Sequence, residues 1–123
     1  MNETIKEMER YAEANNVPII ERDSINFVNK YIQMNNVKKI LELGTAIGYS
    51  AILMASASED VEITTIERDE KRYLEAVKNI KKFNLEDRIT LLYKDAFDVN
   101  LTEKFDLIFI DAAKAQNTRF FEK

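Results

Sequence analysis

Residues 39–55, KILELGTAIGYSAILMA, decide the fold, because they run from an apolar segment of strand length into a segment with a helical pattern. The apolar run over 40–43 stops at Gly44, and a helical pattern begins after Gly48. These are the only 2 glycines in 123 residues. Glycine accepts positive φ and lets another group approach the backbone closely. The stretch therefore predicts a strand–turn–helix unit that holds a nucleotide-type ligand against the N-terminus of the helix.

A simple strand-to-helix turn is the alternative explanation, since a pair of glycines alone is a weak motif. A dinucleotide cofactor is disfavoured, because the G-x-G-x-x-G pattern of that cofactor class is absent.

The composition restricts the chemistry. The chain has no cysteine and no histidine, so disulfides, thiolate or histidine-bound metals and histidine-dependent catalytic triads are excluded. Any metal must be held by oxygen ligands, which favours magnesium or calcium. The net charge is −4 and no long Lys/Arg run occurs, so the sequence has no electrostatic signature of tight nucleic-acid binding. No apolar run has the length of a membrane span and no signal-peptide core is present, so we expect a cytoplasmic location and no membrane partner.

The remaining sequence alternates between helical and strand patterns within one expected domain, residues 1–123. We expect N-terminal helices in 1–36, where one helix precedes a break at 15–18 and another starts at Asp23 or Ser24. A core of Rossmann type should follow over 37–123, with strands at 38–43, 61–66, 89–93 and 105–110 and helices at 50–57 and 70–83. The predicted apolar faces are Ile25, Val28, Tyr31 and Ile32 in the second helix, and Tyr73, Ala76, Val77 and Ile80 in the fourth.

This alternation predicts an α/β fold with right-handed βαβ crossovers and a doubly wound parallel sheet. Ligands of such sheets bind outside the carboxyl ends of the strands. Four acidic side chains fall at or just past those ends: Glu42, Glu67, Asp95 and Asp111. Four acids at one edge repel one another unless a cationic ligand, a metal or backbone N–H groups compensate their charge.

Each acid has a functional and a purely structural interpretation. Glu67 ends the second strand and is placed to accept both hydroxyls of a ribose, or it is a surface acid that caps the next helix. Asp95 is placed to bind an adenine amino group, or it forms a turn. Asp111 ends the most apolar strand, where an unpaired carboxylate is costly. Lys114 follows it and would take a proton from a hydroxyl if a nearby metal lowered its pKa; an exposed loop lysine is the alternative.

The segments LELGTAIGYSA, TTIERDE and FIDAAKAQ together resemble the class I S-adenosylmethionine-dependent O-methyltransferases of the catechol and caffeoyl-CoA type. Within that family the resemblance is nearest to the bacterial branch that methylates 5-hydroxyuridine in tRNA. The residues 17–20, VPII, are also similar to that branch. Ala46 stands where many methyltransferases have a third glycine, which suits this subgroup.

The resemblance implies S-adenosylmethionine as cofactor, assistance by Mg²⁺, and a hydroxylated acceptor, either tRNA or a catechol-like small molecule. It implies a sheet order of 3-2-1-4. The implied cofactor contacts are Glu42, Gly44, Thr45 and Gly48 at the methionine part, Ser50 at its carboxylate, Glu67 at the ribose, Asp95 and Ala96 at the adenine, and Asp111. Asp111 is also the implied Mg²⁺ ligand, and Lys114 the implied catalytic base.

The family continues for several dozen residues beyond this sequence, with three further strands and an Asp-Asn pair that completes the metal site. We therefore expect a sheet that is truncated relative to the family, an incomplete metal site, and a fourth strand at the sheet edge. We expect the chain to be a fragment or truncated form of a longer enzyme, or to pair with another chain that covers this edge, and we expect a homo-oligomer. The alternative function is a non-catalytic cofactor-binding or oligomerisation module.

Overall fold

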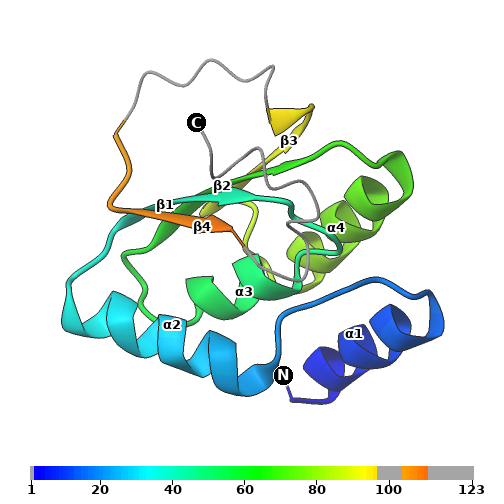
Figure 1. The fold of residues 1–123 in the computed structure, drawn as a ribbon, viewed down its shortest axis with the longest axis horizontal. Helices are drawn as coiled ribbons and strands as arrows, with labels where there is room; N and C mark the ends of the chain where they lie inside the picture. The colour runs from blue at the N-terminus through cyan, green and yellow to red at the C-terminus, as the bar shows by residue number, and fades with distance from the viewer. Residues whose placement is uncertain (1, 97–103, 111–123) are drawn as a thin grey trace.

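The computed structural model describes residues 2–96 and 104–110, and the elements within them alternate in the predicted way (Figure 1). They are α1 (Asn2–Ala14), α2 (Arg22–Met34), β1 (Lys39–Leu43), α3 (Tyr49–Ala55), β2 (Glu62–Glu67), α4 (Glu70–Lys82), β3 (Ile89–Tyr93) and β4 (Leu107–Ile110). No helix in the described part is long and apolar enough to cross a membrane.

The four strands form one parallel sheet in the order β3-β2-β1-β4, which confirms the predicted order. Ile40 of β1 is in register with Ile63 of β2 and with Leu107 of β4, and Ile63 is in register with Ile89 of β3. Residues in register point to the same face of a sheet. These isoleucines therefore form one continuous buried row across the sheet, near the amino ends of the strands.

Helices α2, α3 and α4 lie on one face of this sheet (Figure 1). Ser50 of α3 donates a hydrogen bond to Glu42 of β1, and the ring of Tyr73 in α4 lies 5.0 Å from that of Tyr93 in β3. Glu42 and Tyr93 belong to the same set of alternating positions, because the register aligns both with β2 residues of one face. The α2 side chains Asn29 and Gln33 bond to carbonyls of Leu53 and Ala57, so α2 packs on α3.

Two predicted core residues are exposed instead. Tyr31 on α2 is 46% exposed and Val77 on α4 is 42% exposed. The apolar stripe of each helix is wider than the strip that contacts its neighbours, so its edge faces solvent. On α4, Asn79 is buried beside Ile80, although its polar side chain gave no reason to expect this.

The amino ends of the strands are fastened by side chains. Arg88, just before β3, donates to the carbonyl oxygens of Ala55, Ser58 and Val61 at 2.5–3.1 Å. Asp106, just before β4, accepts the backbone N–H groups of Lys38 and Lys39 at 2.9 and 3.0 Å. The bend at Asp106 explains why β4 begins later than predicted, at Leu107.

The Asp106 contacts make the stability of the sheet sensitive to acid. The two backbone hydrogen bonds hold the pKa of Asp106 below its usual range. A depressed carboxyl pKa adds stability above the unfolded pKa, about 4, and this stability is lost as the pH falls through the folded pKa. Urea unfolding of Asp106→Asn should show lower stability than wild type at neutral pH, and the difference should disappear in strong acid. An equal difference at both pH values would contradict this account.

Candidate functional site

The glycine turn has a backbone that few residues other than glycine adopt. Gly44 has φ 92° and Gly48 has φ 91°, so both lie in the left-handed region. Between them Ala46 also has positive φ, at 51°. The turn between β1 and α3 therefore needs both glycines for its conformation, as the sequence predicts.

Hydrogen bonds tie this turn to the neighbouring elements. Gly44 N–H and Thr45 N–H both donate to the carbonyl of Ile66 at the end of β2, at 2.9 and 3.1 Å. The side-chain amide of Asn79 in α4 donates to the carbonyl of Ile47 at 2.9 Å. The turn is thus held from two sides by hydrogen bonds within the protein.

A chain of buried polar side chains lies below the turn. Glu42 is 0% exposed and accepts hydrogen bonds from the hydroxyl groups of Ser50 and of Thr65, the latter at 2.7 Å. The Thr65 hydroxyl lies 2.6 Å from that of Thr45. Polar groups buried this deeply are stable only with partners of this kind. The chain joins β1, β2, the turn and the first turn of α3 into one unit.

Glu67 closes the turn from the end of β2. Its side-chain oxygens accept the N–H of Ala46 at 2.7 Å and the N–H of Asp69 at 3.0 Å, and the residue is 7% exposed. The helix cap itself is Asp69, which accepts the N–H of Arg72. Glu67 is therefore a buried acid at the turn rather than a surface capping acid. A carboxylate has about four acceptor positions, so positions remain for two hydroxyl donors.

Asp95 lies at the same edge of the sheet, just past β3. Arg68, the residue after Glu67, approaches its carboxylate to 3.4 Å. This pair is exposed to solvent on the arginine side, so we assign it little stability. Ala96 follows and is half-buried. The two residues expected at an adenine therefore lie beside the end of β2 that carries Glu67.

A narrow hollow, too small to hold a water molecule, lies between the turn and the segment that joins α1 to α2. Its lining residues are Ile19, Ile20, Thr45, Ala46, Tyr49 and Ser50. A ligand bound at the turn would contact the isoleucines on one side and Ser50 on the other. The turn and the segment between α1 and α2 thus lie in close contact at the carboxyl edge of the sheet.

Six of the predicted site residues are brought together here: Glu42, Gly44, Thr45, Gly48, Ser50 and Glu67. Asp111 and Lys114, the predicted metal ligand and base, lie outside the described residues. Within residues 2–96 and 104–110, no group of three acidic side chains is placed to hold a metal ion. The predicted Mg²⁺ site therefore finds no support in the described part.

Three residues of this site were missed from the sequence. Thr65 of β2 and Asn79 of α4 are both buried, and Tyr49 is 2% exposed at the start of α3. None of the three belongs to a motif that sets it apart from its neighbours in the sequence. A buried partner such as Glu42 is the only signal for Thr65, and it becomes visible once the strands are paired.

Comparison with known proteins gives a consistent result. The family model described as O-methyltransferase matches residues 1–123. The catechol O-methyltransferase of Niastella koreensis is 38% identical over 103 residues, which are 78% of this chain and 47% of that protein.

Solved structures match over nearly all of this chain. A Staphylococcus aureus protein assigned as a caffeoyl-CoA O-methyltransferase has a TM-score of 0.85 and 43% identity, covering 96% of this chain and 58% of that one. An O-methyltransferase of Bacillus cereus in complex with SAH has a TM-score of 0.82 and 33% identity, covering 98% and 59%. The chain spans about half the length of the curated relative and under two thirds of these structures.

Proposed function

Since this chain belongs to the O-methyltransferase family, we propose that it is the cofactor-binding part of an S-adenosylmethionine-dependent O-methyltransferase. The observation that carries the proposal is the position of Glu67, a buried acid that bonds to the glycine turn and keeps acceptor positions open. A ribose offers two adjacent hydroxyl donors, which fit those positions. Structures of the family that hold SAH, such as the Bacillus cereus enzyme, support the same ligand.

The other site residues fit the rest of this ligand. Glu42, Gly44, Thr45 and Gly48 would line its methionine part, and Ser50, between Glu42 and the hollow, would approach the carboxylate. Asp95 and Ala96 would lie against the adenine. S-adenosylmethionine supplies a methyl group on a sulfonium: the acceptor oxygen attacks the methyl carbon, the carbon–sulfur bond breaks, and sulfur keeps the electron pair. The protein would contribute chiefly by holding the two reactants in line.

Calorimetry with S-adenosylmethionine and with S-adenosylhomocysteine tests the proposal. We expect saturable binding of both, and no binding of NAD⁺, because the site lacks the dinucleotide glycine pattern. Thermal shift should agree, since stabilisation grows with the ratio of ligand concentration to Kd. Absence of binding by both sulfur nucleosides would overturn the proposal.

We extend the proposal to the acceptor and the metal. Asp111 would hold Mg²⁺, which lowers the pKa of a bound hydroxyl, and Lys114 would take the hydroxyl proton. The acceptor is either a 5-hydroxyuridine in tRNA or a catechol-like molecule. A methyl-transfer assay with each acceptor, with Mg²⁺ or with EDTA, distinguishes them. Turnover that is unchanged in EDTA would contradict the metal, and cofactor binding without turnover on either acceptor would favour the non-catalytic cofactor-binding module.

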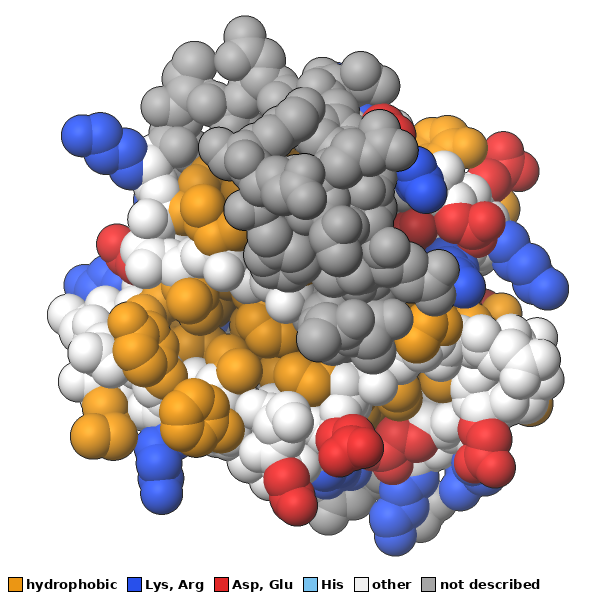
Figure 2. All heavy atoms as spheres, viewed as in Figure 1, with side chains coloured by type: hydrophobic (Ala, Val, Ile, Leu, Met, Phe, Trp, Pro, Cys, Tyr) orange, Lys and Arg blue, Asp and Glu red, His pale blue; other side chains and the backbone are white. Residues whose placement is uncertain are grey.

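A homo-oligomer is the last part of the proposal. Phe27 and Met34 on α2 are 74% and 78% exposed, and Tyr31 between them is 46% exposed. Figure 2 shows hydrophobic side chains gathered on this face, over α2. Exposed apolar patches of this kind commonly mark interaction sites. Light scattering of the chain should give more than the monomer mass; a monomer at high concentration would contradict the expectation.

A further inference from the structure

The segment of residues 17–21, which we call the strap, crosses the molecule between α1 and α2 and forms one wall of the hollow at the glycine turn. Its side chains Val17, Ile19 and Ile20 are only partly buried against the core. Its backbone hydrogen bonds within the described residues reach the flanking helices alone, from Val17 N–H to Ala12 and from Ile25 N–H to Glu21. The backbone of the strap is therefore not bonded to the turn that it covers.

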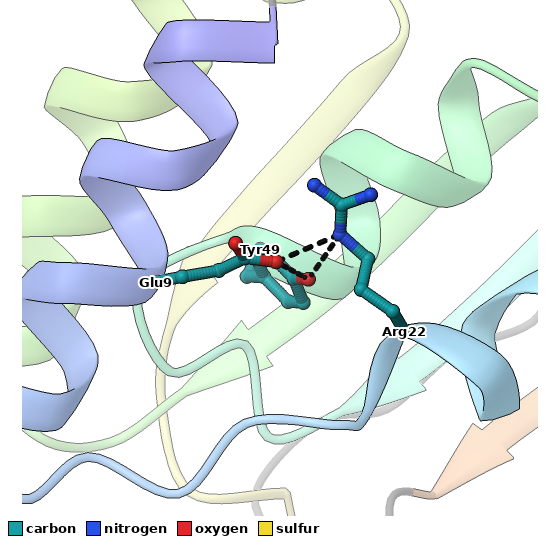
Figure 3. A network of polar contacts seen from close by, with 3 residues as sticks. All are labelled: Glu9, Arg22 and Tyr49. Atoms are coloured by element: carbon teal, nitrogen blue, oxygen red, sulfur yellow. Dashed lines mark hydrogen bonds and ion pairs between the residues drawn. The ribbon is translucent and has the colours of Figure 1, made fainter.

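Side chains make the connection that the backbone lacks (Figure 3). The Tyr49 hydroxyl donates to Glu9 of α1 at 2.5 Å, and Arg22 Nε, directly after the strap, donates to the same carboxylate oxygen at 2.7 Å. Arg22 Nε also lies 3.0 Å from the Tyr49 hydroxyl. Three residues from α1, the start of α2 and the start of α3 thus meet at one point, and we call this group the latch.

Burial of Tyr49 and the hydrogen bonds among the three side chains distinguish the latch from an isolated ion pair at the surface. The ring of Tyr49 is buried in the core while its hydroxyl faces Glu9 and Arg22. Burial and the Glu9 hydrogen bond raise the pKa of Tyr49 to about 12, so it remains a neutral donor. Burial alone would raise the pKa of Glu9, but the hydrogen bonds from Tyr49 and Arg22 outweigh it and lower the pKa. Hydrogen bonds to a charged group are about twice as strong as neutral ones.

Tyr49 is also the link to the ligand side. It stands between Gly48, which ends the turn, and Ser50, and its own side chain lines the hollow with the strap isoleucines. Movement of the strap away from Tyr49 would therefore widen the hollow. Neither Glu9 nor Arg22 lines the hollow, so both act through the strap and Tyr49.

We propose that Glu9, Arg22 and Tyr49 are positioning residues that hold the strap closed over the methionine end of the cofactor site and so slow cofactor release. This inference rests on the proposed function, since it requires that a sulfur nucleoside binds at the turn. The latch sets the lifetime of the complex, whereas Glu67 supplies contacts to the ligand itself.

The test compares Tyr49→Phe and Glu9→Gln with wild type and with two matched controls, Tyr11→Phe and Glu7→Gln, which remove the same groups at positions outside the latch. Stopped-flow kinetics and calorimetry with S-adenosylhomocysteine give the dissociation rate and Kd, and hydrogen exchange follows the strap amides. We expect both latch variants to release the ligand roughly 10-fold faster, with a similar rise in Kd and little change in association rate, as one lost charged hydrogen bond predicts. Exchange at 19–21 should rise without ligand, and the controls should match wild type.

The outcomes separate the two proposals. If wild type does not bind S-adenosylhomocysteine, the proposed function fails, and the latch as a cofactor device fails with it. If wild type binds and the latch variants keep the same dissociation rate, the latch alone is overturned, even if their melting temperatures fall, because that pattern is purely structural. Glu9 is half-buried at the surface, so Glu9→Gln decides the matter if Tyr49→Phe does not fold.

Discussion

Replacing Glu67 with alanine should weaken the binding of S-adenosylhomocysteine by about 100-fold or more. The proposed ribose would lose two hydrogen bonds to a carboxylate, each worth roughly 1.5–3 kcal/mol, and tenfold in Kd corresponds to about 1.4 kcal/mol. The Ala46 N–H would lose its acceptor as well, so the turn would lose one of its fixed points. Calorimetry with the folded variant measures the change.

Two further variants sharpen this test. Glu67→Gln keeps the shape and one acceptor oxygen, so its Kd should lie between those of wild type and alanine. Glu62→Ala removes an exposed acid from the opposite end of the same strand and should bind like wild type. Equal affinity of Glu67→Ala and wild type would remove the main support for the proposed function.

Replacing Glu42 with alanine should cost about 3–5 kcal/mol of unfolding free energy, because it leaves a cavity and takes the acceptor from two buried hydroxyl groups. The two hydroxyl groups, those of Ser50 and Thr65, belong to the row of buried polar side chains below the turn, which is shielded from water. Urea unfolding measures the loss of stability. Cofactor binding should weaken as well, because Thr45 of the turn is hydrogen-bonded to Thr65 in the same row of buried polar side chains.

Glu42→Gln is the matched control for this effect. Its side chain has nearly the same volume, and the hydroxyl groups are able to rotate so that they accept from its amide or donate to its oxygen. Its cost should therefore stay near 1 kcal/mol. Equal losses for alanine and glutamine would contradict this account, because they would mean that neither the retained volume nor the retained oxygen restores stability.

Most elements were predictable because strands and helices alternate in a sequence with few breaks, whereas the sheet order came from the resemblance to a family. The predicted strand at 89–93 has the observed bounds, and the predicted helix at 70–83 differs from α4 by one residue at its end. The site could be predicted as far as it lies at strand ends, since parallel strands bring Glu42 and Glu67 to one edge. The resemblance to a family added the identity of the ligand, which no periodicity provides.

The rest depended on contacts between segments that are far apart in the sequence. The latch joins Glu9 to Tyr49, 40 positions apart, and neither residue has a distinctive local pattern. Asn79 was missed because a buried amide is visible only when the carbonyl that it serves, that of Ile47, is known. The prediction that Val77 belongs to the buried face of its helix was wrong, because helical spacing gives the direction of an apolar face but not the width of the surface that covers it.

The fastening at the amino ends of the strands has a consequence for how this protein changes over generations. Arg88 and Asp106 hold the amino ends of the strands by bonding to backbone groups, whose chemistry is the same whatever side chains surround them. Exposed side chains at the opposite edge that make no contact with the glycine turn or with the buried Glu42 and Glu67 can therefore change without breaking these bonds. The framework that carries the site is thus kept by bonds that do not depend on the side chains around it.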